Sequence, residues 1–163
     1  MKIAITGHTS GIGKSLFDYY ESARWLRDDT ALGFSRSNGY NINNPQKIIE
    51  QSLDSDVFIN NAHDGFNQVS LLYELINNGY ESKIINISSN SSDGIKDQIH
   101  QYAIAKYALD KASEQLFYRG YDVTNLRFGY IDTPRVAHRD KKKMDVHYAC
   151  EVIFWVLRQP HRI

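Results

Sequence analysis

The sequence predicts one α/β domain over residues 1–163, with a mainly parallel sheet of five or six strands flanked by helices. Short apolar runs, typical of buried strands, alternate with longer stretches in which apolar residues recur at helical spacing. A glycine-rich turn separates the first apolar run from the first helical stretch. The length suits a single domain with a sizeable core.

The first predicted elements are a strand, a turn and a helix. Residues 1–6 read MKIAIT, a short apolar run that predicts a buried strand. Gly7, Gly11 and Gly13 follow, and residues 14–23 are predicted to be helical. Glycines let the backbone turn tightly and approach a diphosphate, which the free N–H groups and the dipole of a helix N-terminus attract. The arrangement predicts a cradle for a dinucleotide.

Later apolar runs predict further strands at residues 31–34, 57–59 and 84–87. A strand over residues 40–42 is missing, antiparallel or reduced to an extended segment, because only residues 37–39 separate it from the second strand. Parallel neighbours need a crossover of a dozen or more residues. Three further helices are predicted, over residues 66–78, 102–117 and 145–158. After the last of them no residues remain to form a strand.

Three side chains near the middle of the chain form a candidate proton-transfer set. Tyr102 and Lys106 are four residues apart, so on a helix both project from one face. A nearby ammonium stabilises the tyrosinate, so a phenol whose ordinary pKa is about 10 can act as acid or base closer to neutral pH. Ser89, at the end of an apolar run, can hydrogen-bond a substrate oxygen as charge develops there.

Five motifs follow one another along residues 1–135. They are Thr6-Gly7-x-x-x-Gly11-Ile12-Gly13, Asn60-Asn61-Ala62, Asn86-Ile87-Ser88-Ser89, Tyr102-x-x-x-Lys106 and Phe128-Gly129-Tyr130-Ile131-Asp132-Thr133-Pro134. In type and order they resemble the motifs of the short-chain dehydrogenase/reductase family. The resemblance implies a Rossmann-like fold and a nicotinamide cofactor.

The resemblance also implies roles for the matching residues. Ser89 would polarise a substrate carbonyl, Tyr102 would be the general acid or base, and Lys106 would lower the tyrosine pKa and hold the nicotinamide ribose. Ser89 is preferred to Ser88 because it lies thirteen residues before Tyr102, the family's spacing. Ser88 would then face the other side of its strand. No metal ligands are assigned, and the predicted cofactor-binding residues are Gly7, Ser10, Gly11, Ile12, Gly13, Ser35, Arg36, Asn41, Ile42, Asn60, Ala62, Ile131 and Thr133.

Charge at the end of the second predicted strand indicates which cofactor is bound. NAD-binding folds usually place an acidic residue there to hold the ribose hydroxyls, whereas an arginine accommodates the extra phosphate of NADP. The position carries Arg36 between Ser35 and Ser37, with no carboxylate within four residues on either side. The sequence therefore favours NADP(H) over NAD(H).

Several segments are shorter than the resemblance would lead us to expect. The family has a longer stretch before the serine, with an asparagine that supports a proton relay, and Asn67 is the candidate substitute. His63 stands where the family has a glycine beside the cofactor. A short segment follows Pro134, so we expect a small, open substrate site. We also expect an oligomer interface unlike the family's usual tetramer, and for a homo-oligomer the sequence favours a dimer over that tetramer.

These residues support three functional hypotheses. The first is an NADP(H)-dependent oxidoreductase that interconverts a small-molecule carbonyl and an alcohol by hydride transfer. The second is a nucleotide-binding sensor or scaffold with little turnover, which the shortened segments and His63 favour. The third takes Gly13-Lys14-Ser15 as the end of an NTPase phosphate loop. In that motif the first glycine falls on His8, and residues 57–59 run into Asn60 instead of a magnesium-binding aspartate.

Composition limits the partners. The chain has 19 basic and 19 acidic residues, so it has no overall field for nucleic acid or an anionic membrane. It lacks a run of about 18 apolar residues that would indicate a membrane span. Its N-terminus forms the cofactor strand instead of a signal peptide, so we expect a cytoplasmic protein. The single cysteine excludes an internal disulfide. The apolar face of helix 102–117 either packs in the core or pairs two subunits.

Overall fold

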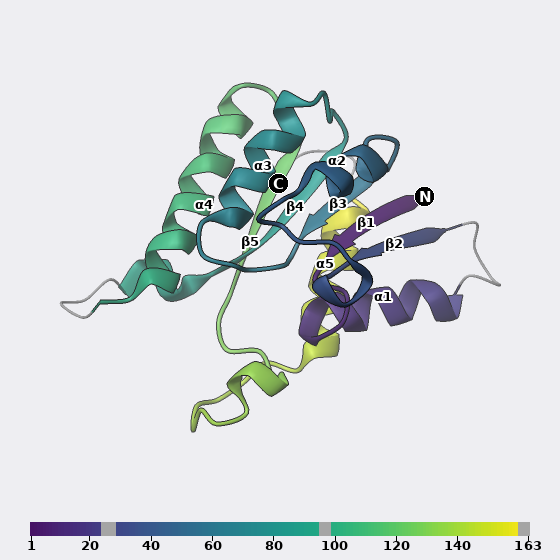
Figure 1. The fold of residues 1–163 in the computed structure, drawn as a ribbon. Coiled ribbons are helices and arrows are strands. Elements are labelled where there is room, and N and C mark those ends of the chain that lie inside the picture. The colour runs from purple at the N-terminus through teal and green to yellow at the C-terminus, as the bar shows by residue number, and fades with distance from the viewer. Residues whose placement is uncertain (24–28, 95–98, 160–163) are drawn as a thin grey trace.

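The computed structural model describes residues 1–23, 29–94 and 99–159. Five parallel strands form one sheet in the order β2-β1-β3-β4-β5, as Figure 1 shows. The strands are β1 (Lys2–Thr6), β2 (Thr30–Phe34), β3 (Val57–Asn60), β4 (Lys83–Ser89) and β5 (Val123–Phe128). The predicted fold class is confirmed, with five strands in the described part of the chain and all of them parallel.

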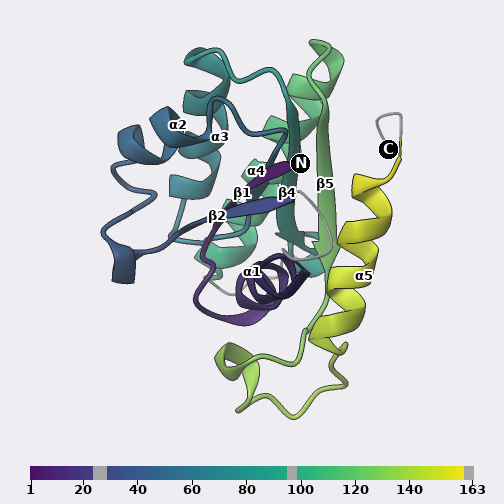
Figure 2. The same cartoon turned by 90° about the vertical axis from the view of Figure 1, so that its right-hand side faces the viewer.

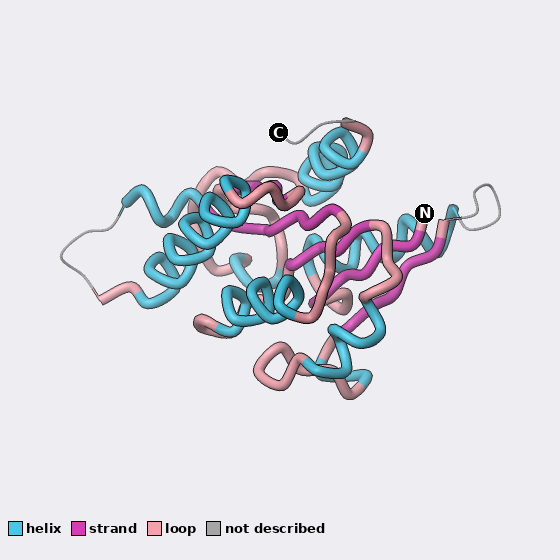
Figure 3. Tube along the Cα trace, turned by 90° about the horizontal axis from the view of Figure 1, so that it is seen from above, coloured by secondary structure: helices cyan, strands magenta, loops and turns pink. Residues whose placement is uncertain are grey.

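Helices cover both faces of the sheet (Figures 2 and 3). On one face, α1 (Gly11–Ala23) and α5 (Val146–Leu157) pack against each other. The other face carries α2 (Gln46–Ser52), α3 (Asn67–Asn77) and α4 (Gln101–Tyr118). The four helices predicted from the sequence are confirmed, and α2 is a helix that the prediction missed.

Alternation of side chains along the strands builds two cores. Ile3 and Ile5 of β1 face α1 and α5, whereas Ala4 between them faces α3 and α4. In β3, Ile59 and Phe58 divide between the two cores in the same way. Parallel strands covered by helices on both faces are apolar on both sides, which explains why the strands read as continuous apolar runs.

Residues 40–45 do not form a strand of the sheet. Asn41 and Asn44 make only an isolated bridge, and α2 begins directly afterwards. The chain then enters β3, which pairs with β1 on the side away from β2. Of the three alternatives that the sequence left open, the strand is missing. β2 is therefore the edge of the sheet among the described residues.

The apolar face of α4 packs inside the chain. Ala105, Leu109, Ala112 and Leu116 are each at most 3% exposed. Of the two alternatives for this face, the structure shows core packing for these four residues, whereas Ala108 of the same face is partly exposed. None of the described helices has both the length and the apolar character that crossing a membrane requires.

Candidate functional site

A cavity of about 900 Å³ opens where the carboxyl ends of the strands meet. Its wall includes Gly7 after β1, Ser35 after β2, Asn61 after β3, Ser89 at the end of β4 and Gly129 after β5. Open parallel sheets bind ligands at this edge. The volume is within the range of sites that hold small molecules and cofactors.

The glycine turn between β1 and α1 forms one wall of the cavity. Gly7 has a φ of 73°, in the left-handed region that favours glycine. A Cβ on Gly13 would lie 2.3 Å from the carbonyl oxygen of Gly7, so only glycine lets α1 approach the turn. The turn leaves the first N–H groups of α1 beside the cavity, and this arrangement fits the diphosphate of a dinucleotide.

Residues that follow β2 form the end of the cavity at the edge of the sheet. Ser35, Arg36, Asn41 and Ile42 all line it, as the sequence predicts. Asn41 Oδ1 is engaged locally, because it accepts a hydrogen bond from the backbone N–H of Asn43. Arg36 is exposed, and the described residues include no ion-pair partner for it. A cation without a carboxylate partner fits the additional phosphate of NADP.

The three predicted catalytic residues meet at the opposite end of the cavity. Ser89, Tyr102 and Lys106 all line it. Lys106 Nζ lies 5.6 Å from the centre of the Tyr102 ring. It is 2.7 Å from the carbonyl oxygen of Ile87 and 2.7 Å from Gln68 Oε1. Burial, with the charge of Arg135 nearby, lowers the pKa of Lys106 to about 7.

Gln68 contacts the predicted catalytic lysine, and the sequence analysis missed it. Its side chain is buried on α3, where it accepts from Lys106 and donates to the carbonyl oxygens of Asn60 and Ile87. Asn67, the candidate substitute for the relay asparagine, donates from its Nδ2 to Asp64 Oδ2 at 3.3 Å and is not among the residues that line the cavity. A signal was present in the sequence, because a glutamine on the buried face of a helix needs polar partners.

Two residues assigned to the cofactor lie behind the cavity wall. Gly13 supports the turn through its contact with Gly7. Asn60 is fully buried, and its Nδ2 donates to Asn86 Oδ1 at 2.8 Å and to the carbonyl oxygen of Gln68 at 3.0 Å. Asn61 lines the cavity instead. The reason is strand alternation, which turns Asn60 at the end of β3 towards α3.

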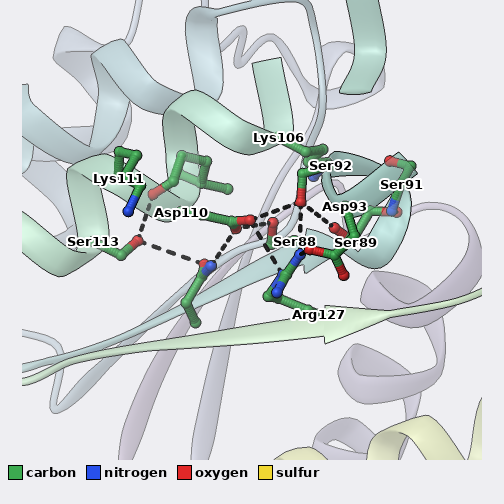
Figure 4. Close-up of polar contacts among 12 residues, drawn as sticks. Ser88, Ser89, Ser91, Ser92, Asp93, Lys106, Asp110, Lys111, Ser113 and Arg127 are labelled. Atoms are coloured by element: carbon green, nitrogen blue, oxygen red, sulfur yellow. Dashed lines mark hydrogen bonds and ion pairs between the residues drawn. The ribbon is translucent and has the colours of Figure 1, made fainter. Parts of the chain in front are cut away.

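Asp110, a carboxylate on α4, forms hydrogen bonds and an ion pair with residues at and after the end of β4 and on β5 (Figure 4). Asp110 Oδ1 accepts from Ser88 Oγ at 2.5 Å, and Asp110 Oδ2 is 2.9 Å from Ser92 Oγ and 3.2 Å from Arg127 Nε. Ser92 Oγ is also 3.1 Å from the carbonyl oxygen of Ser89. Asp110 thereby connects α4, the end of β4 and β5. Ser88 points to this network, as expected from alternation with Ser89.

Three further side chains surround the Tyr102 ring. The ring of His63 meets it edge to face at a centroid distance of 4.7 Å. Arg135 Cζ lies 5.5 Å from the ring centre, and His100 packs nearby. Burial, together with the charges of Lys106 and Arg135, lowers the pKa of His63 to about 4. His63 is therefore neutral at pH 7, beside the tyrosine.

No protein-family model matches the chain, and no curated protein matches its sequence. Solved structures match nearly its whole length. A short-chain dehydrogenase from Burkholderia cenocepacia J2315 in complex with NADP has a TM-score of 0.79 and 18% identity, over 99% of this chain and 85% of that chain. The 3-alpha-hydroxysteroid dehydrogenase from Pseudomonas sp. B-0831, complexed with NADH, has a TM-score of 0.73 and 17% identity, over 98% and 90% of the two chains.

An alcohol dehydrogenase from the archaeon Thermococcus sibiricus, complexed with 5-hydroxy-NADP, has a TM-score of 0.71 and 16% identity, over 98% of this chain and 91% of that chain. Likeness at these identities defines a fold. The chain is a Rossmann-like α/β protein with the short-chain dehydrogenase fold. The fold that the sequence motifs implied is thus confirmed.

Proposed function

We propose that the protein is an NADP(H)-dependent oxidoreductase that interconverts a small carbonyl compound and its alcohol. The observation that carries this proposal is the layout of one cavity. Its glycine wall and Arg36 suit a phosphorylated dinucleotide, and its other end holds Ser89, Tyr102 and Lys106. The solved structures of the same fold include proteins bound to NADP and to NADH, which supports a nicotinamide dinucleotide.

When bound, the cofactor supplies the hydride that reduces the carbonyl carbon. Tyr102 supplies the proton, because its hydroxyl group is the only phenol beside Lys106 in the described cavity wall. The carbonyl oxygen gains that proton and the product is an alcohol. The reverse direction returns the proton to the tyrosinate. Ser89 donates a hydrogen bond to the substrate oxygen, which accumulates negative charge as the reaction proceeds.

Lys106 orients this site and tunes its electrostatics. An ammonium has three N–H donors, and Gln68 Oε1 and the Ile87 carbonyl oxygen accept two of them. The third is available to a cofactor ribose hydroxyl or to the tyrosinate. With a pKa of about 7, Lys106 gains charge when an anion forms beside it, so tyrosinate formation and lysine protonation favour each other.

The preference for NADP(H) rests on Arg36. Its guanidinium follows β2, where the adenosine ribose of a dinucleotide lies in folds of this type. A planar guanidinium donates two parallel hydrogen bonds to a phosphate, and a carboxylate at this position would repel one. Arg36 is therefore a partner for the additional ribose phosphate of NADP, a group that NAD lacks.

The test is a fluorescence titration of the purified protein with NADPH and NADH, followed by a screen of small aldehydes, ketones and alcohols. We expect NADPH to bind more tightly, and Tyr102→Phe to bind it equally well while losing turnover. Binding without turnover of any compound by the unaltered protein would favour a nucleotide-binding sensor. Binding of neither nucleotide would contradict both functions.

A further inference from the structure

The segment between β5 and α5 holds an arginine over the catalytic end of the cavity. Its base is closed by hydrogen bonds from Met144 N–H to the Tyr130 carbonyl oxygen and from Asp132 N–H to the Met144 carbonyl oxygen, both 2.8 Å. Within it, a 3₁₀ turn, Pro134–Val136, carries Arg135. Closure at the base therefore positions Arg135 over the site.

The lining of the cavity is more basic than the chain as a whole. The chain has equal numbers of basic and acidic residues. Among the described lining residues, Arg36, Lys106, Arg135 and Arg139 are basic, and Asp64 is the one carboxylate. Arg36 and Lys106 have roles in the proposed function. Arg135 and Arg139 therefore add positive charge that neither the hydride nor the proton transfer uses.

The charge of Arg135 is not neutralised within the described part of the chain. No carboxylate in residues 1–23, 29–94 or 99–159 forms an ion pair with it. Its field reaches the site, because it contributes to lowering the pKa of both His63 and Lys106. Arg135 Cζ lies 5.5 Å from the centre of the Tyr102 ring, so a substrate group bound to Arg135 would lie close to the carbonyl that Tyr102 would protonate. An anion bound beside Arg135 would offset the repulsion between the charges of Arg135 and Lys106.

We propose that Arg135 binds a carboxylate of the substrate, so that the substrate class is an oxo acid and the corresponding hydroxy acid. This inference rests on the proposed oxidoreductase function. The planar guanidinium holds a carboxylate through two parallel hydrogen bonds and thereby orients the carbonyl group a few bonds away towards Tyr102. Arg139, on the same segment, adds attraction for anions.

The competing role for Arg135 is binding of the cofactor diphosphate. The start of the same segment is close to the glycine wall, since a Cβ on Gly11 would lie 3.2 Å from Thr133 Cγ2. A diphosphate contact would weaken nucleotide binding in an Arg135 variant and affect all substrates alike. A substrate contact would spare nucleotide binding and affect acids alone. This difference allows one variant to separate the two roles.

The experiment compares acids with their methyl esters. Pyruvate and acetoacetate are paired with methyl pyruvate and methyl acetoacetate, and binding to the NADP⁺-loaded protein is measured by saturation-transfer NMR competition. NADPH consumption is recorded in parallel. We expect the acids to be favoured by about tenfold, the factor of one charge-assisted contact. Arg135→Gln removes that preference and leaves ester binding and the NADPH dissociation constant within about twofold. Arg135→Lys restores part of it.

Arg119→Gln is the matched control, because this exposed arginine ends α4 and does not line the cavity. Equal binding of acids and esters to the unaltered protein would overturn the substrate class, whether or not turnover is detected. So would an Arg135→Gln variant that loses acids and esters equally. Failure to bind NADPH would instead contradict the proposed function, and the acid preference is then read from the nucleotide-free protein.

Discussion

The side-chain amide of Gln68 holds the amine of Lys106, with 2.7 Å between Oε1 and Nζ. Both side chains are buried, at 1% and 3% exposure. The same amide donates to the carbonyl oxygens of Asn60 and Ile87, at 2.6 and 3.2 Å. One residue of α3 thus links the ends of β3 and β4 to the lysine of α4. Gln68 is therefore one of the two acceptors that orient Lys106, the other being the carbonyl oxygen of Ile87.

Gln68→Leu is expected to lower the free energy of unfolding by about 1 to 3 kcal/mol, because it leaves buried polar groups without partners. Gln68→Glu keeps an acceptor and adds a negative charge, so it should raise the pKa of Lys106 above about 7. Urea unfolding measures the first effect, and NMR of the lysine side-chain nitrogen measures the second. Gln46→Leu, at an exposed position of α2, is the control. An unchanged Lys106 titration in Gln68→Glu would refute the positioning role.

Asp110→Ala should destabilise the protein by roughly 2 to 4 kcal/mol, because Arg127 and two serines lose a shared, mostly buried acceptor. Urea unfolding tests the magnitude. Asp18→Ala is the control, since Asp18 forms an exposed pair with Lys14 whose loss should cost about 0.5 kcal/mol or less. Similar losses in the two variants would show that the contacts of Asp110 stabilise the protein no more than an exposed ion pair does.

The pH dependence of stability should report His63. Its pKa is about 4 in the folded protein against an ordinary value near 6.5, so the unfolded chain binds more protons between these values. Stability therefore falls as the pH is lowered from 6.5 to 4. Because His63 is only half-buried, we expect its share to be about 1 to 2 kcal/mol. His63→Phe should flatten the curve of thermal stability against pH in this window, whereas His147→Asn at the exposed start of α5 should leave it unchanged.

Arg36→Ala should weaken NADPH binding by about ten- to a hundredfold, the range expected for a lost charge-assisted phosphate contact. NADH binding should stay within about twofold, since NADH lacks that phosphate. Nucleotide fluorescence titration distinguishes the two, with Arg119→Ala as the control. Equal weakening of NADPH and NADH binding would show that Arg36 contacts a part of the nucleotide that both cofactors share.

Gly13→Ala tests the close contact between the start of α1 and the glycine turn that lines the cavity. The new Cβ would meet the Gly7 carbonyl oxygen at 2.3 Å, so α1 or the turn must move. We expect a loss of about 2 kcal/mol or more in the free energy of unfolding and weaker NADPH binding. At Gly94 a Cβ meets nothing within 4 Å, which makes Gly94→Ala the matched control. A stable Gly13→Ala variant with intact binding would contradict the role of this contact.

The parallel sheet and the glycine cradle could be predicted because local patterns determine them. Apolar runs mark β1, β3 and β4, and the glycines within residues 7–13 indicate the tight turn between β1 and α1. The pairing of Tyr102 with Lys106 was equally accessible, since helical spacing places both on one face of α4. Arg36 was located by its position after the second strand. These features depend on neighbours in the sequence.

The remaining features join residues that are distant in the sequence. Gln68 meets Lys106, and Asp110 meets Arg127, only because α3, α4 and β5 pack at one end of the sheet. Strand alternation turned Asn60 into the core, although its motif predicted a cofactor contact. The sequence by itself determined the fold class, the glycine cradle and the tyrosine–lysine pair. Tertiary packing alone decided which polar groups support the lysine and which arginine lies over the tyrosine, because burial and long-range contacts arise only when the elements assemble.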